Sequence, residues 1–255
     1  ARPLGQARLT SASGKAFGVD FTTAELDLEF QGEALRIKNL NAALGGGDLK
    51  VQGTWINAQG VPAFEGEVDL REVELSDLGL QNPEAPMIGG HVTGRASLSG
   101  PIETPRVSAR LESKRIFYGD EGIGAFVVDV VGAGDGILHV KGQSDSPRFQ
   151  AEVSGSIEAK APHQSRLEVN LVTARIDPVL RALGSRFQNS VVITASANAS
   201  VLGPLLEPDL ITARVREGQL KIAVPEYAIE AAPGFVLDLE RGAIQISGLT
   251  LNGEG

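Results

Sequence analysis

The chain of 255 residues contains no cysteine, one methionine, one tryptophan and three histidines, and only 5% of its residues are aromatic. The absence of cysteine excludes disulfides, thiolate nucleophiles and cysteine-ligated metals. His91, His139 and His163 have no second histidine or glutamate beside them at the spacing of a zinc site. No run approaches the roughly 18 apolar residues that a membrane-spanning helix needs. These absences exclude several classes of site and of membrane anchor within the sequence.

Basic residues are also in deficit, because the formal net charge is -9 at pH 7. A nucleic-acid-binding surface needs a basic excess, so we expect no nucleic-acid partner. No Gly-x-Ser-x-Gly nucleophile motif occurs, and the glycine-rich segment 132–136 lacks the following helix that a dinucleotide loop requires. The acidic residues are spread along the chain rather than paired for hydrolysis. We therefore predict a protein that is not an enzyme and needs no metal or cofactor.

What the sequence does contain is short alternating segments separated by glycine. Hydrophobic residues make up 42% of the chain, and glycine accounts for 31 residues. In segments such as 26–30, 64–70 and 235–240, apolar side chains alternate with acidic or polar ones. This period of two is typical of an antiparallel sheet with one apolar and one polar face. The predicted turns contain Gly32, Gly45 to Gly47, Gly132 to Gly136, and Gly218.

The sequence also repeats itself with a period of about 103 residues. Segment 98–111 resembles segment 202–215, with Gly100 and Gly203 each followed by a proline. Both segments continue into an Ala-Arg-apolar triplet, and residues 7–9 form the same triplet close to the first residue. Such internal similarity indicates a repeat architecture.

Two further blocks follow in the same order. Segment 34–40 resembles segments 138–142 and 242–249, and segment 67–70 resembles segment 168–171. We therefore predict that residues 1–255 form a single elongated β-repeat segment of a larger protein, with both chain ends inside repeats.

One segment has a helical rather than a strand-like pattern. Asp177 suits a helix N-cap and Pro178 the first helical position. The apolar residues up to Phe187 then follow helical spacing. We expect one short helix near 177–187 that packs on the sheet.

The pattern alone leaves open what covers the apolar face of the sheet. A second sheet could cover it, as in a sandwich, or the sheet could curl and leave an open groove. An aliphatic groove would suit acyl chains, which need only apolar contact. The predicted lining residues all lie at apolar positions of the alternating strands. They are Leu26, Leu28, Phe30, Leu35, Ile37, Val51, Phe64, Val68, Phe126, Val128, Val130, Val140, Phe149, Val153, Leu220, Ile222, Phe235, Leu237 and Leu239.

The Leu-x-Gly-Pro block at 98–111 and the block at 35–53, with its Gly-Gly-Gly-Asp-Leu run, also carry a family resemblance. With these blocks the chain resembles the TamB and AsmA-like family of bacterial envelope proteins. The resemblance implies an all-β fold, an elongated and curled, taco-like antiparallel sheet with an apolar groove. It implies a periplasmic location and an inner-membrane anchor outside this sequence. It offers no catalytic residues to transfer.

The resemblance also implies a function in lipid transport and outer-membrane biogenesis. We expect an internal segment of a hydrophobic conduit that moves phospholipid between the inner and outer membranes, with phospholipid acyl chains as partners. A first alternative is a scaffold for outer-membrane β-barrel proteins, which would bind client strands at a sheet edge or groove and cooperate with an outer-membrane assembly barrel. A second alternative is a structural segment of a secreted adhesin with a filled interior.

Overall fold

The computed structural model contains one large antiparallel sheet of 18 strands and one two-stranded hairpin. It describes residues 4–16, 19–44, 46–58, 61–78, 88–118, 121–176, 191–204, 207, 210–223, 228–232, 234–240 and 243–254. The expected all-β class is confirmed.

The described elements of the N-terminal half are strands, apart from one short 3-10 helix, η1, between β7 and β8. They are β1 (Leu4–Ser11), β2 (Gly14–Ala16), β3 (Val19–Phe21), β4 (Thr23–Gln31), β5 (Ala34–Leu44), β6 (Gly47–Ala58), β7 (Val61–Glu74), η1 (Leu75–Leu78), β8 (Ile88–Gly89) and β9 (His91–Pro101).

The C-terminal half continues with longer strands and ends in short ones. These are β10 (Arg106–Tyr118), β11 (Glu121–Ala133), β12 (Ile137–Ser146), β13 (Phe149–Glu158), β14 (Gln164–Arg175), β15 (Val192–Pro204), β16 (Thr212–Ala223), β17 (Ala228–Ala231), β18 (Phe235–Glu240), β19 (Ala243–Ser247) and β20 (Leu251–Glu254).

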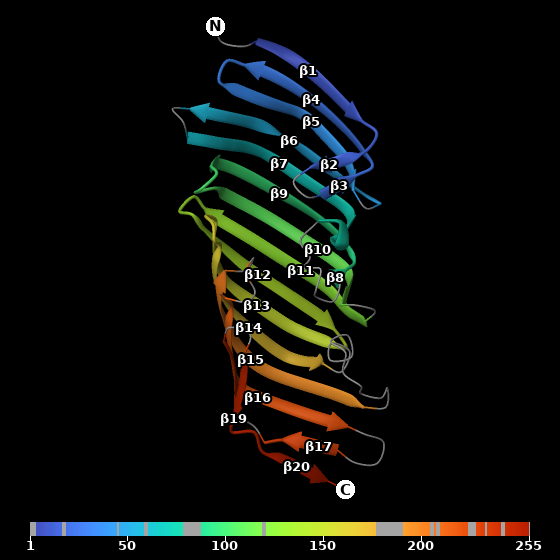
Figure 1. Cartoon of the computed structure of the whole chain (residues 1–255), viewed down its shortest axis with the longest axis vertical. Helices are drawn as coiled ribbons and strands as arrows, with labels where there is room; N and C mark the ends of the chain where they lie inside the picture. Colours follow the sequence, from blue (N-terminus) through green and yellow to red (C-terminus); the bar gives the residue numbers. More distant parts are fainter. Residues whose placement is uncertain are drawn as a thin grey trace.

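Most strands pair with the strand that precedes them and the strand that follows, so the sheet is a meander (Figure 1). The β2–β3 hairpin stands outside this ladder, and β1 pairs directly with β4. Near the C-terminus, both β17 and β18 pair with β16, each along a different part of it. β17 pairs in turn with β20, and β18 pairs with β19. The strands therefore follow one another along a single elongated sheet.

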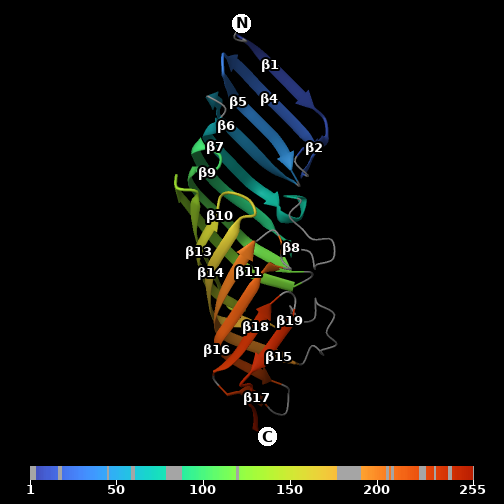
Figure 2. The ribbon, with the colours of Figure 1, turned by 60° about the vertical axis from the view of Figure 1, so that its left-hand side comes forward.

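The sheet is open. In Figures 1 and 2 the strands nearest the two termini lie at opposite ends of a long, twisted ribbon. The strongly curled, taco-like shape that the resemblance implies is therefore not what this chain forms. The physical reason is that successive strands rotate by the ordinary β twist, and β1 pairs only with β4 among the described strands.

The helix expected near 177–187 lies outside the described residues. At the equivalent position one repeat earlier, the chain forms the single 3-10 turn η1. Within the part of the chain that the structure describes, no helix is long and apolar enough to cross a lipid bilayer.

The repeated sequence blocks occupy equivalent strands. The Ala-Arg-apolar triplets lie in β1, β10 and β16, which are the first strands of successive six-strand runs along the ladder. Gly100 and Gly203 end the sixth strand, and both have a positive φ, of 95° and 129°. After each glycine the proline carbonyl accepts the same turn hydrogen bond, from Thr104 at 3.1 Å and from Glu207 at 3.1 Å. The repeated sequence therefore encodes a repeated turn.

β-Bulges shift the alternation of side chains by one residue, so that apolar residues on both sides of the bulge lie on the same face of the sheet. On β7 two residues lie opposite one between Leu70 and Val73, and β14 has the same irregularity between Leu171 and Ala174. In both strands the residue after the bulge is buried, with Val73 0% and Ala174 1% exposed. A third bulge interrupts β16 before Gly218. The prediction of a turn at Gly218 is wrong, because β16 continues through it.

Most of the buried hydrophobic side chains in the described part of the chain lie near one long edge of the sheet. The one hydrophobic cluster among the described residues contains Ala42, Leu44 and Val73, with Phe21 from the β2–β3 hairpin packed against it. The register places this cluster on the same face of the sheet as Leu40 and Leu70. Most of the apolar side chains along the rest of the sheet are only half-buried.

Candidate functional site: the apolar face of the sheet

One face of the sheet carries an unbroken row of small and apolar residues. Residues that are direct partners across strands share a face, so the pairing register defines the row. It runs through Leu9, Leu26, Leu40, Val51, Val68, Ala96, Ala109, Val130, Val140, Gly155, Leu167, Val201, Ala213 and Leu239. We call the side of the sheet that contains this row the apolar face.

All nineteen residues predicted as lining lie on the apolar face. The register links Leu28 to Ile37, and Phe30 to Leu35 and on to Phe64. On β16 the bulge before Gly218 shifts the alternation by one residue, which keeps Leu220 and Ile222 on the same side as Phe235. Their contact with lipid stays a prediction.

Most of the apolar face is partly accessible to solvent among the described residues. The exception is one long edge, where the register places the buried Val73, Ala174 and Ile193 on the same face. Eighteen of the nineteen residues are half-buried and Phe30 is exposed. A second sheet packed on this face would bury most of them almost completely, because core positions of a sandwich lose nearly all solvent contact. The sequence left a groove and a sandwich both open, and among the described residues no second large sheet packs on this face.

The opposite side, which we call the polar face, carries a recurring ion pair. In each case the arginine of an Ala-Arg-apolar triplet meets an aspartate on the next strand of the ladder. The pairs are Arg8 with Asp27 at 3.6 Å, Arg110 with Asp129 at 3.0 Å, and Arg214 with Asp238 at 2.5 Å. The aspartates belong to a second triplet, apolar-Asp-apolar, in segments 26–28, 128–130 and 237–239. Sequence reasoning missed this triplet, although its recurrence was visible.

These contacts shift protonation equilibria in the expected directions. The hydrogen bonds of Arg110, first to Glu112 and then to Asp129, raise its pKa above the ordinary value. Hydrogen bonds from Gln31 and Lys38 lower the pKa of Glu29, whose carboxylate lies 3.2 Å from the Lys38 ammonium. Both effects stabilise the charged forms of Arg110 and Glu29.

Exchanging the partners of one pair tests whether the ion pairs favour the register. Asp129→Arg places a third guanidinium beside Arg110 and Arg95, which are direct cross-strand partners, so we expect the melting temperature to fall by a few degrees. Adding Arg110→Asp should recover most of that loss. Because the pair is exposed, 1 M salt should shrink both effects. A double variant as unstable as the single variant at low salt would contradict the pairing.

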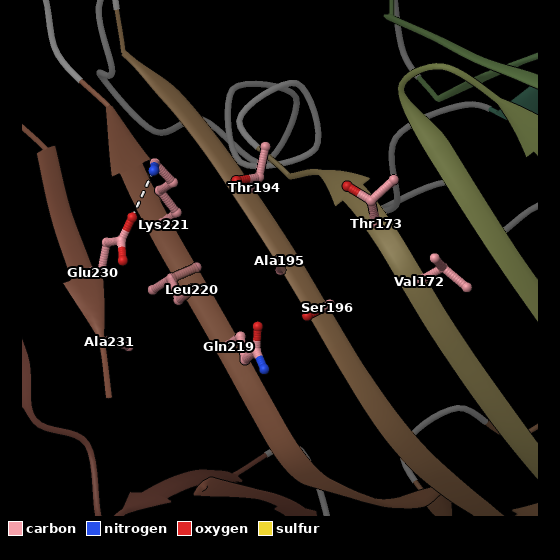
Figure 3. Close-up of a pocket in the computed structure, with 10 residues that line it drawn as sticks. All are labelled: Val172, Thr173, Thr194, Ala195, Ser196, Gln219, Leu220, Lys221, Glu230 and Ala231. Atoms are coloured by element: carbon pink, nitrogen blue, oxygen red, sulfur yellow. Dashed lines mark ion pairs between the residues drawn. The ribbon is translucent and has the colours of Figure 1, made fainter. Parts of the chain in front are cut away.

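The hollow drawn in Figure 3 lies across β14 to β17. It measures about 300 Å³, and the Lys221 ammonium lies 2.5 Å from the Glu230 carboxylate at one side. Thr194, Lys221 and Glu230 are register partners in one row of the polar face. The hollow contains hydroxyl and amide groups but no histidine beside a nucleophile. Across the described ranges, no group of three or more acidic or histidine side chains could hold a metal.

Comparisons with known proteins return no matching family model, no similar curated protein and no similar solved structure.

Proposed function

We propose that the apolar face binds phospholipid acyl chains, and that this chain is an internal segment of a conduit between the inner and outer membranes of a bacterial envelope. One observation carries the proposal: the apolar face is continuous along the meander, and among the described residues most of its side chains stay partly exposed. The periplasmic location and the membrane anchorage of the whole protein rest on the family resemblance and are part of the proposal.

The chemistry of the face suits an acyl chain. Hydrocarbon tails have no hydrogen-bonding groups, and each methylene removed from water contributes about 0.8 kcal/mol. No specific polar residue is then needed, which agrees with a face made mainly of aliphatic side chains and glycine, with a few aromatic rings and serines. The binding would be non-directional, so a tail could slide from one strand to the next without breaking a defined contact.

The dimensions also suit this ligand. A strand such as β6, with 12 residues, spans roughly 40 Å at about 3.3 Å per residue. The row from β1 to β18 extends roughly 60 Å at about 4.8 Å per strand. The face is therefore wide enough for an extended tail and long enough for several lipids in succession. Transport would be passive, with headgroups in water at a long edge of the sheet.

Trp55 provides a direct test, because it is the only tryptophan and lies on the apolar face opposite Leu35 and Phe64. We expect phospholipid with bromine on its acyl chains to quench Trp55 fluorescence, since quenching by bromine requires close contact. Unbrominated lipid of the same headgroup should leave the intensity unquenched. The measurement is a fluorescence titration of the purified chain with lipid.

The neighbouring residue supplies a matched control. Ile56 lies on the polar face and is 38% exposed, close to the 36% of Trp55. In the double variant Trp55→Phe and Ile56→Trp, the single tryptophan moves to the other face with little change in exposure. We expect brominated lipid to quench this variant far less. Equal quenching of both proteins would show that lipid does not prefer the apolar face and would overturn the proposal.

A further inference from the structure

A hollow of about 500 Å³ lies at the long edge of the sheet where β10 meets β11 and β12 meets β13. Its lining includes three basic residues, Lys114, Arg115 and Arg148, together with Phe117 and Ile123. No acidic residue is among the described residues that line it. In a chain with net charge -9, three cations around one hollow are unusual and indicate an anionic ligand.

The three cations contrast with the arginines of the repeated triplets in their ion pairs. No carboxylate within the described part of the chain forms an ion pair with Lys114, Arg115 or Arg148. The Arg115 guanidinium instead lies 5.9 Å from the centre of the Phe117 ring, a cation–π contact that leaves its N–H groups able to donate elsewhere. By contrast, the arginines of the repeated triplets are each held by an aspartate.

The backbone that presents these cations is fixed by hydrogen bonds. A β-bulge on β10 between Ser113 and Ile116 places Lys114 and Arg115 at the edge of the ladder. On the other side, the Ser146 hydroxyl donates to the Ile123 carbonyl at 2.9 Å and accepts from the Phe149 N–H at 3.0 Å. The Arg148 carbonyl accepts from the Arg175 N–H at 2.8 Å. The turn that carries Arg148 is therefore held between neighbouring strands.

The hollow borders the apolar face. Ser113 is the register partner of Phe126, and Ser146 is the partner of Phe149. Both phenylalanines belong to the apolar face, and both partners lie within two residues of the cations. A molecule with an acyl chain on this face and a phosphate at its end could reach both regions at once.

We propose that Lys114, Arg115 and Arg148 form a phosphate-binding site at the edge of the apolar face, which would hold the phosphodiester of a phospholipid headgroup. The lipid part of this inference rests on the proposed function. Guanidinium groups donate paired, charge-assisted hydrogen bonds to phosphate oxygens, and the lysine adds a point charge. The site has no equivalent in the other repeats, because residues 12–13 are Ala and Ser and residues 218–219 are Gly and Gln.

Calorimetric titration of the full chain with three probes tests the site. The probes are dihexanoyl-phosphatidylglycerol, dihexanoylglycerol without a phosphate, and inorganic phosphate. In the double variant Arg115→Gln and Arg148→Gln, we expect affinity for the phospholipid to fall about tenfold or more, as loss of charged hydrogen bonds predicts. Affinity for dihexanoylglycerol should be unchanged. As a control, Arg166→Gln removes an exposed arginine on β14. It should change neither the affinity for the phospholipid nor the affinity for dihexanoylglycerol.

The outcomes separate this inference from the proposed function. If both lipids bind and the double variant binds the phospholipid as well as the parent, the phosphate site is wrong and the acyl-binding face stands. If inorganic phosphate binds and is lost in the double variant while neither lipid binds, the site takes free phosphate and the proposed function fails. If none of the phosphate-containing probes responds to the variant, the inference is overturned.

Discussion

Val128→Asp is expected to reduce the phospholipid that co-purifies with the chain by at least about tenfold, because a buried carboxylate beside hydrocarbon costs several kcal/mol. Val128 lies on the apolar face between Leu111 and Gly142. In the lipid-free protein its side chain is only half-buried, so the carboxylate stays hydrated and the fold should persist. Mass spectrometry of extracted lipid, scaled to protein amount, measures the effect, and circular dichroism checks the fold.

Val131→Asp is the matched control on the same strand. Val131 lies on the polar face between Ser108 and His139 and is 53% exposed. The Val131→Asp variant introduces the same charge three residues from Val128, so we expect it to co-purify with as much lipid as the unmodified chain. Equal loss of lipid in both variants would show that charge itself, rather than the face it occupies, controls binding. Unfolding of Val128→Asp alone would indicate a covered core instead of an open face.

Gly66→Ala is expected to give the largest loss of stability of any substitution considered. Gly53 and Gly66 are direct partners on β6 and β7. A Cβ atom on Gly66 would lie 2.2 Å from the Gln52 carbonyl oxygen and 2.7 Å from the tip of the Phe64 ring. The backbone cannot move away without breaking the β6–β7 ladder, so we expect a loss of at least about 2 kcal/mol. Thermal or urea denaturation measures it.

Gly5→Ala serves as the control for Gly66→Ala. Gly5 also lies in a strand of the apolar face, opposite Phe30. A Cβ added there meets no atom within 4 Å, so the change should stay within about 0.5 kcal/mol. Similar losses in both variants would mean that alanine at strand positions, and not the close approach of β6 and β7, determines the result.

The two-faced strands could be predicted from the sequence because alternation has a period of two and the strands obey it over most of their length. The repeat blocks likewise fall in equivalent strands. The bulges on β7 and β16, which shift this alternation by one residue, could not be predicted. Glu72 and Glu217 adopt positive φ values of 49° and 55° there, and the sequence has no glycine at those positions to indicate it. A glycine between two apolar runs predicts a turn at Gly218, whereas the structure has a bulge there within β16.

The overall shape was harder to predict than the pattern. A curled and a merely twisted sheet share the same alternation, and they differ only in small rotations between neighbouring strands. The basic cluster around Arg115 was also invisible in the sequence. Lys114 and Arg148 are separated along the chain by two intervening connections, and only the pairing of β10, β11, β12 and β13 brings them to one hollow.

The open meander has a consequence for how the molecule holds together. Each central strand draws its stability from two adjacent strands, so the energetics resemble a one-dimensional chain of nearest-neighbour couplings. No closure condition fixes the total number of strands, as it would in a barrel. Six-strand units could therefore be added or lost in evolution without rebuilding the others, and the reach of the apolar surface would scale with the number of units.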